Sequence, residues 1–411
     1  MHTSADDLAR PPAAREMART LPLLIAALSM IGPFAIDTYL PSFREMESSL
    51  RATPVQIQQS LTAFLVPFAF MCLWHGSLSD AFGRRKVILW SLAFVTISSV
   101  GCALAPNVQT LWFFRAVQGL AGGIFVVGRA VVRDVYEGPA ALRVISQVSV
   151  LFGIAPAIAP VIGGFLHEWF GWRSVFVFLA IFSAGLMLWS ALRLPETLPL
   201  DRRQPLRFRP LMSSYGRTLT HPQFLAAALA GAFNFTALFL YIASAPAFLL
   251  THLGVPETRF FWLFGPVTAG MMLGGALSGR LAGRLDARHV LAWSAGLMIT
   301  ASAVNVVFHM VQPAQLPWSV APLFFYATGM SLAMPTLALI GLDLFPEQRG
   351  LASSCQAFLL TGLNALTSGL LAPFASVAPI WLALTSAALM CIGLICTWAC
   401  LPPKRAEVVA V

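Results

Sequence analysis

The stretch "SLSDAFGRRKVIL", residues 77 to 89, places four charged side chains in a chain that is mostly apolar. The sequence of 411 residues is 58% hydrophobic and 10% charged, with a mean hydropathy of +0.76. Charged residues make up about a quarter of an ordinary soluble domain, so lipid is the natural solvent for this composition. We interpret Asp80, Gly83, Arg84, Arg85 and Lys86 as a turn between two membrane-spanning segments.

Apolar runs recur on both sides of this turn. About 20 apolar residues are needed to cross a hydrocarbon layer about 30 Å thick, and continuous rather than alternating runs indicate helices. The sequence therefore predicts an all-α membrane protein with twelve transmembrane helices in two six-helix bundles. The predicted spans are 21–40, 56–79, 87–105, 109–132, 144–166, 174–194, 223–250, 260–281, 290–311, 317–342, 351–374 and 379–401.

The longest polar interval, residues 193–221, divides these spans into six before and six after. It is rich in arginine and proline, which is typical of a linker. The predicted organisation is a cytoplasmic N-terminal segment, a first bundle, a cytoplasmic linker, a second bundle and a cytoplasmic tail. Their limits are 1–20, 21–194, 195–222, 223–401 and 402–411.

The net charge of +9 follows from topology and does not indicate a nucleic-acid partner. With a cytoplasmic N-terminus, nearly all of the Lys and Arg residues outside the apolar runs fall on the cytoplasmic side. The other side receives Arg44, Arg51, Arg173 and Arg259. This asymmetry follows the positive-inside rule and predicts an even number of spans with both chain ends inside.

A short internal repeat links the two predicted bundles. "GRLAGRLDARHVL", residues 279–291, aligns with "GSLSDAFGRRKVI", residues 76–88, at an offset of 203 residues, and both segments join the second span of a half to its third. Parallel repeats are one known transporter architecture, in which the substrate site lies between the halves.

Several motifs resemble known families. "GSLSDAFGRRKVIL" and "LWFFRAVQGLAGG" (111–123) resemble the loop and fourth-span signatures of the major facilitator superfamily. Five further motifs together resemble its Bcr/CflA-type drug resistance transporters. These are "DTYLPSF" (37–43), "VRDVYEG" (132–138), "APAIAPVIGGFL" (155–166), "GWRSVF" (171–176) and "LPETL" (194–198). The resemblance implies a proton-coupled antiporter that exports small amphipathic drugs or antibiotics across a bacterial inner membrane by alternating access.

Asp37 and Arg115 are the candidate residues for proton coupling. At about 1.5 Å per residue, Asp37 lies about 24 Å from the cytoplasmic edge and Arg115 about 9 Å below the outer surface, so they share a level within about 3 Å. A carboxyl group inside a membrane favours uptake of a proton, and a nearby guanidinium favours its release. Two alternatives remain open, namely a solvated interfacial Asp37 and an Arg115 bonded to backbone carbonyls.

The turn at Gly83 supplies a second candidate site, a conformational latch formed by Gly76, Asp80, Gly83, Arg84, Arg85 and Arg133. Asp80 is an acid among cations, so we expect it to have a partner. Arg84, Arg133 and the N-terminus of the helix beginning near Gly350 are the three candidates. The third would hold the two halves together on the cytoplasmic face in the outward-open state. Alternatively, these charges fix only the orientation of the chain.

A cavity between the bundles requires large apolar side chains and a few polar groups. The candidate substrate-binding residues are Gln59, Phe64, Phe152, Asn234, Phe235, Tyr241, Phe261 and Trp262. In the fifth span, Pro156, Pro160, Gly163 and Gly164 are candidates for a helix bend, with close helix packing as the alternative.

The sequence contains no nucleotide-binding loop, nucleophile motif or metal-ligand spacing, so we predict a protein that is not an enzyme and needs no metal or cofactor. The expected partners are a small-molecule substrate, protons and membrane lipid, with no nucleic acid, and the expected state is a monomer. An exporter or symporter of a native small metabolite on the same fold is the alternative function.

Overall fold

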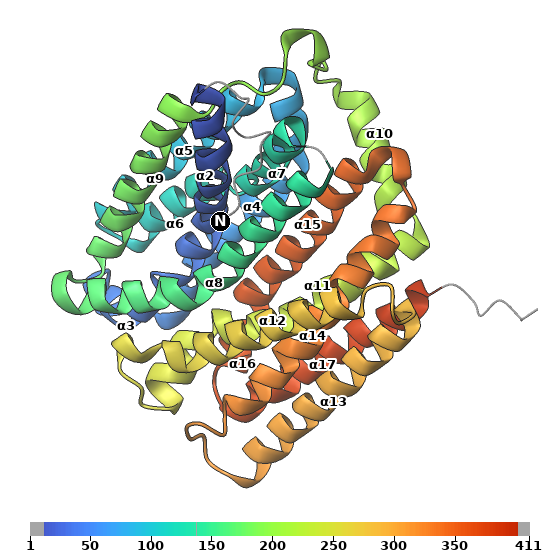
Figure 1. The fold of residues 1–411 in the computed structure, drawn as a ribbon. Coiled ribbons are helices and arrows are strands. Elements are labelled where there is room, and N and C mark those ends of the chain that lie inside the picture. Colours follow the sequence, from blue (N-terminus) through green and yellow to red (C-terminus); the bar gives the residue numbers. More distant parts are fainter. Residues whose placement is uncertain (1–11, 137, 402–411) are drawn as a thin grey trace, which may run out of the picture.

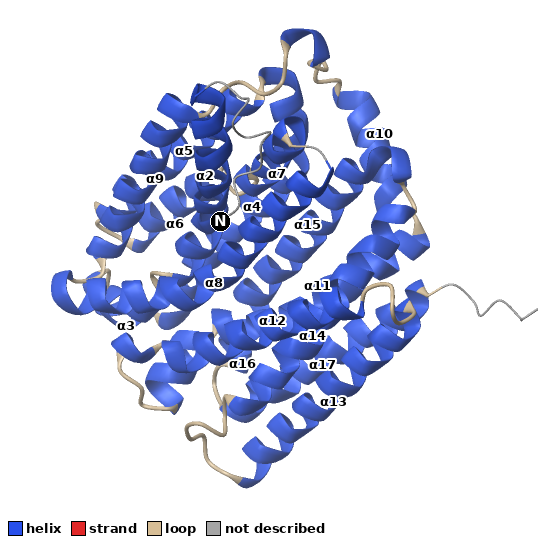
Figure 2. Cartoon of the chain, viewed as in Figure 1, coloured by secondary structure: helices blue, strands red, loops and turns tan. Residues whose placement is uncertain are grey.

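The computed structural model describes residues 12–136 and 138–401, and this part of the chain is helical, with no strand (Figure 2). Within these described residues, twelve helices are long and apolar enough to cross a membrane, which confirms the predicted number of spans. The predicted tail at 402–411 and the first eleven residues of the predicted N-terminal segment lie outside the described residues.

The first half of the chain forms one group of helices (Figure 1). Within it α2 packs against α8, α4 against α6, and α5 against α9. The helices are α2 (Pro12–Asp37), α3 (Phe43–Ser49), α4 (Pro54–Phe82), α5 (Arg84–Ala103), α6 (Val108–Gly119), α7 (Ile124–Val135), α8 (Gly138–Phe170) and α9 (Arg173–Arg193), with the short η1 (Leu40–Ser42) after α2.

The second half forms the other group (Figure 1). Here α11 packs against α17, while α14 lies against both α12 and α13. The helices are α11 (Pro222–Ala243), α12 (Phe261–Leu281), α13 (Ala287–Val311), α14 (Ala321–Asp343), α15 (Arg349–Leu366), α16 (Ala372–Ala375) and α17 (Pro379–Cys400). The short segments are η3 (Pro246–His252), η4 (Glu257–Arg259), η5 (Pro346–Gln348) and η6 (Thr367–Leu371). Between the two groups, α4 packs against α15 and α8 against α12.

The linker contains a helix that the polarity of the segment did not predict. After the short η2 (Leu200–Arg202), α10 (Phe208–Leu219) buries Tyr215 and Thr218, which are three residues apart on one helix face. The Tyr215 hydroxyl donates a hydrogen bond to the Leu73 carbonyl oxygen, and Phe208 stacks on Trp74 of α4. We call the end of the molecule that carries α10 the linker end, and the opposite end the far end.

Three predicted spans depart from a regular α-helix. A turn at residues 120–123 divides the fourth span into α6 and α7, where Gly119 approaches the Phe64 carbonyl so closely that a methyl group would collide with it. The seventh span continues into η3 and the eleventh into η6, and both are π-helical. Wide turns of this kind leave backbone carbonyls available to other donors and occur frequently at functional sites.

Large apolar side chains cover the outside of the helices. Exposed tryptophans lie near the helix ends, with Trp90, Trp293 and Trp398 at the linker end and Trp169, Trp318 and Trp381 at the far end. Tryptophan is enriched at the two interfaces between a membrane and water, so this arrangement fits a multi-pass membrane protein.

Candidate functional site

A cavity of about 600 Å³ lies between the two halves of the chain. Its wall is mainly apolar and rich in phenylalanine and methionine, which adapt to ligands of different shape. The large apolar residues that line it include Phe64, Phe68, Phe125, Phe152, Phe235, Phe239, Phe264, Met271, Met330 and Met334.

The ionisable side chains of this wall, among the described residues, are Asp37 and Arg129, and both belong to the first half of the chain. The second half contributes uncharged hydrogen-bonding groups. These are Ser331, Ser353, Gln356, Thr361 and Asn364. The cavity is therefore asymmetric, because both charges lie on the side of the first half, whereas the polar groups of the second half are all neutral.

Asp37 is the last residue of α2 and is 3% exposed. Its Oδ1 atom is buried and has no hydrogen-bond partner. The solvated interfacial carboxyl that we considered as an alternative is therefore not what this structure contains. An isolated buried carboxylate is costly, so this group favours a proton or a cationic ligand.

Arg115 is fully buried, and no hydrogen bond or ion pair joins its described side chain to that of Asp37. Its guanidinium donates to the Ala35 carbonyl at 2.9 Å and to the Gln118 side chain, and it lies 4.4 Å from the centre of the Tyr39 ring. The expected direct pairing is therefore absent from this conformation, and the alternative of an arginine bound to backbone carbonyls is what we observe. The shared level is retained, because Ala35 is two residues from Asp37 in α2.

Three of the eight candidate substrate-binding residues line the cavity, namely Phe64, Phe152 and Phe235. The other five lie elsewhere because they have other packing partners, and we correct the prediction for them. Gln59 donates to the Gly369 carbonyl at the far end, and Tyr241 accepts a hydrogen bond from Asn305. Asn234 packs against Gly393 of α17, while Phe261 and Trp262 stack on each other at the start of α12.

The four candidate bend residues all lie within α8, which is one continuous helix. Pro156 lines the cavity, whereas Pro160 is buried. The backbone carbonyls of Thr38 and Glu257 approach Gly163 and Gly164 so closely that a methyl group at either glycine would collide with them. The glycines therefore serve close helix packing, which was the alternative to a bend.

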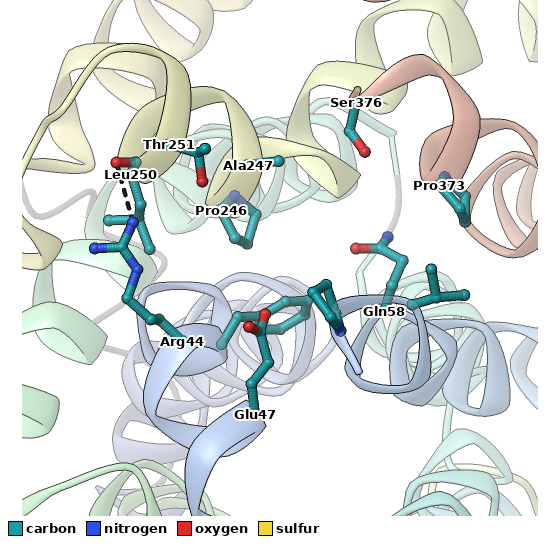
Figure 3. Close-up of a pocket in the computed structure, with 12 residues that line it drawn as sticks. Arg44, Glu47, Gln58, Pro246, Ala247, Leu250, Thr251, Pro373 and Ser376 are labelled. Atoms are coloured by element: carbon teal, nitrogen blue, oxygen red, sulfur yellow. Dashed lines mark hydrogen bonds between the residues drawn. The ribbon is translucent and has the colours of Figure 1, made fainter. Parts of the chain in front are cut away.

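The far end of the molecule joins the two halves (Figure 3). Arg44 donates a hydrogen bond to the Leu250 carbonyl in η3 at 3.3 Å, and Gln59 donates to the Gly369 carbonyl in η6 at 2.8 Å. Both accepting carbonyls belong to the π-helical segments. Gln58 adds a hydrogen bond to the Ser368 hydroxyl, also in η6. These contacts close the cavity at the far end.

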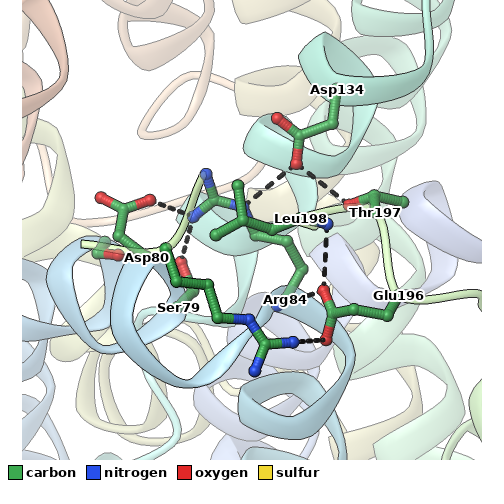
Figure 4. Close-up of polar contacts among 9 residues, drawn as sticks. Ser79, Asp80, Arg84, Asp134, Glu196, Thr197 and Leu198 are labelled. Carbon is green, nitrogen blue, oxygen red and sulfur yellow. Dashed lines mark hydrogen bonds and ion pairs between the residues drawn. The ribbon is translucent and has the colours of Figure 1, made fainter. Parts of the chain in front are cut away.

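A cluster of charged side chains occupies the linker end of the first half (Figure 4). Arg84, at the start of α5, pairs with Asp80 near the end of α4 and donates through Nε to Asp134 of α7 at 3.1 Å. Thr197 donates to the same Asp134 oxygen at 3.0 Å. The cluster thus joins the turn, the end of the fourth span and the start of the linker.

Glu196 completes the cluster. It accepts hydrogen bonds from the backbone N–H groups of Arg84 at 2.9 Å and Leu198 at 3.1 Å, and it pairs with Arg203 at 3.5 Å. Gly83 has φ +99°, and a side chain there would strike the Glu196 carboxylate, so the turn requires glycine.

Of the three candidate partners for Asp80, the structure contains Arg84. Arg133 is exposed, and its neighbour Asp134 takes part in the cluster in its place. Arg85 donates to the Ala191 carbonyl in the sixth span at 2.6 Å, and Gly76 faces Ser354 of α15. The contact of Asp80 with the start of α15 remains a prediction for another conformation.

A family model described as Major Facilitator Superfamily matches residues 22–363. The chain belongs to the major facilitator superfamily. Proteins of this superfamily are membrane transporters rather than enzymes, which agrees with the twelve apolar helices and with a cavity between two halves.

Relatives within the superfamily include transporters named for drug resistance. The chain is 32% identical over 353 residues to the Uncharacterized MFS-type transporter YdgK of Bacillus subtilis, covering 85% of this chain and 88% of the relative. It is 26% identical to the Bicyclomycin resistance protein homolog of Haemophilus influenzae, covering 85% and 88%. It is also 26% identical to the Multidrug transporter MdfA of Yersinia pestis, covering 90% of each chain.

Solved structures of the superfamily share the fold. A bacterial homolog of the human lysosomal transporter Spinster superimposes with a TM-score of 0.73 at 16% identity, covering 95% of this chain and 97% of the other. The human organic anion transporter MFSD10 superimposes with a TM-score of 0.66 at 18% identity, covering 94% and 100%.

Sequence reasoning missed four residues that the structure brings into these sites. Arg129 lies in the fourth apolar run, where a cation that no loop explains was the available signal. Asp134 and Glu196 were acids near the predicted cytoplasmic edge. Asn364 gave no distinguishing signal, because an amide in an apolar run is equally suited to helix packing.

Proposed function

We propose that this superfamily member is a proton-coupled antiporter that exports small amphipathic compounds, such as drugs or antibiotics, by alternating access. The observation that carries the proposal is the buried Asp37 carboxyl on the wall of a cavity closed at the far end. The drug-resistance names of two relatives support the substrate class. Both sides of the cavity come from one chain, which supports a monomer as the working unit.

The distribution of cations supports the orientation. The linker end carries Arg84, Arg85, Arg203 and Arg217 in the turn and the linker, so by the positive-inside rule we place it in the cytoplasm. The cavity reaches toward this end, because Arg129, Ser149 and Ser353 line it. The conformation is then the one that takes up substrate from the cytoplasm.

The proton enters the cycle through Asp37. With the far end closed, Asp37 lines the cavity that reaches toward the cytoplasm, and substrate bound in that cavity would displace the proton of this carboxyl toward the inside. Opening the far end requires the hydrogen bonds of Arg44 and Gln59 to break, which would bring outside water to the cavity and change the surroundings of Asp37. Proton uptake from outside and release inside would then accompany substrate export.

The latch acts in the opposite state. When the linker end closes, Asp80 approaches the first turn of α15, whose unbonded N–H groups attract a carboxylate. Gly76 already faces Ser354 in that turn region, so a small rotation of the halves would bring the two groups together.

Inside-out membrane vesicles test the proposal. We expect substrate to dissipate an imposed proton gradient, reported by a pH-sensitive dye, with the wild-type protein. If chemically diverse antibiotics never change the dye signal in vesicles that contain folded protein, proton-coupled drug export is wrong. The metabolite alternative predicts a different result, an extracellular metabolite deficit after deletion of the gene with unchanged antibiotic tolerance.

A further inference from the structure

Two arginines of the fourth span, Arg115 and Arg129, have opposite surroundings. Arg115 in α6 is fully buried and binds the Ala35 carbonyl and the Gln118 side chain. Arg129 in α7 is exposed and lines the central cavity. Its described contact is with the ring of Phe125, whose centre is 5.8 Å from the guanidinium carbon. One arginine is therefore part of the helix packing, and the other faces an open space.

Arg129 lies toward the linker end of the cavity. Its neighbour Gly128 packs against Ile25 of α2, twelve residues before Asp37 in the same helix. At about 1.5 Å per residue, the level of Arg129 is therefore about 18 Å from that of Asp37. Ser149 and Phe152 of α8 line the same cavity.

No acidic side chain of the described residues neutralises Arg129. Asp37 is at the other end of the cavity, and Asp134 binds Arg84 and Thr197. Arg133, one turn further along α7, adds a second positive charge on that side. A guanidinium stays charged at all relevant pH values, and an uncompensated charge within a membrane span is costly and marks a pathway or a ligand site.

We propose that Arg129 is a substrate-binding residue that selects compounds with an anionic head group on an apolar body. The guanidinium would hold a carboxylate, sulfonate or phosphate through paired hydrogen bonds, while Phe125 and Phe152 contact the apolar part. The inference rests on the proposed transport function and narrows its substrates to amphipathic anions and zwitterions. Anionic lipid head groups share this chemistry and are a second source of the same ligand.

Equilibrium binding to the purified full-length protein in detergent tests this role. The probes are 4-(1-naphthyl)butyrate, 4-(1-naphthyl)butanol and 4-(1-naphthyl)butylamine, which share one apolar body and differ in charge. We expect the wild-type protein to bind the acid about tenfold more tightly than the alcohol, and the amine least tightly. Arg129→Gln removes this preference with the affinity for the alcohol unchanged, and Arg129→Lys keeps most of it.

Arg143→Gln is the matched control, because Arg143 is an exposed arginine at the same end that does not line the cavity. An acid preference that survives in Arg129→Gln, or disappears equally in Arg143→Gln, overturns the proposal. Repeating the titration in phosphatidylcholine vesicles with and without phosphatidylglycerol distinguishes a small-molecule anion from an anionic lipid head group as the ligand of Arg129. If the lipid is the ligand, it occupies the site and abolishes the preference for the acid only when phosphatidylglycerol is present. The binding titration imposes no proton gradient. Its outcome is therefore independent of whether the vesicle assay detects proton-coupled export.

Discussion

The two halves of the molecule follow the same helical plan but differ in where they carry charge. In the first half, the turn at Gly83 joins Arg84, Asp80 and Asp134, and the cavity wall holds Asp37 and Arg129. In the second half, the corresponding turn has Gly283 in place of Asp80. The ion pair described at this turn is the exposed contact between His289 and Asp286 at 3.8 Å.

This difference separates two tasks. The first half provides the groups whose charge or protonation matters, and the second half provides an apolar surface with neutral hydrogen-bonding groups such as Asn364 and Gln356. A repeat in which one copy lacks the acid at the position of Asp80, in a half whose described residues contribute no charge to the cavity wall, lets proton chemistry and ligand accommodation vary independently. Paired substitutions in the two halves test this division.

The largest expected effect is the loss of gradient-driven export in Asp37→Asn, because the amide keeps the shape of the side chain but cannot exchange a proton. Its counterpart on the other wall is Asn364→Ala, which we expect to weaken transport several-fold and to leave coupling intact. Dye-monitored proton movement in vesicles distinguishes the two variants. Wild-type coupling in Asp37→Asn would remove this residue from the proton path and end the division of tasks.

The next effect concerns the two turns. Arg84→Gln leaves Asp80 and Asp134 without their cation, and since Arg84 is largely buried we expect a loss of about 2 kcal/mol in the free energy of unfolding. His289→Gln removes an exposed pair and is expected to change stability by less than about 0.5 kcal/mol. Thermal unfolding in detergent measures both changes, and equal shifts would show that the cluster in the first half has no special weight.

Glycine contacts give a slightly smaller effect. Gly163→Ala places a methyl group against the Thr38 carbonyl, so we expect a loss of about 1 to 2 kcal/mol from overpacking in the first half. At Gly265 in α12, the space that an added methyl group would occupy is open. Gly265→Ala should therefore be neutral or slightly stabilising. Melting temperatures compare the two variants, and an unchanged value for Gly163→Ala would mean that α8 adjusts without cost.

The sequence predicted the spans well because continuous apolar runs and the asymmetry of cations are local signals. It placed Asp37 and Arg115 at a similar level but left open whether Arg115 pairs with Asp37 or binds backbone carbonyls, since depth along a helix does not specify which way a side chain turns. Asn234 and Tyr241 were assigned to the cavity for their chemistry, yet both face other helices. Arg129 was missed because the positive-inside rule counts only the cations outside the apolar runs, and Arg129 lies inside one.

An effect smaller than that of Gly163→Ala is expected at the linker, where Tyr215 forms a neutral contact with the first half while α10 packs against α11 and α15 of the second. Tyr215→Phe removes one hydrogen bond to the Leu73 carbonyl, and we expect a loss of about 1 kcal/mol in the free energy of unfolding at neutral pH. Burial raises the pKa of Tyr215 to about 12, so the folded state favours the protonated hydroxyl. Its stabilisation is therefore complete below pH of about 10, where an unfolded tyrosine begins to ionise, and declines as the pH rises toward 12. Unfolding of the wild-type protein and the Tyr215→Phe variant across this range should converge at high pH, whereas a constant difference would mean that the hydroxyl contributes through packing alone.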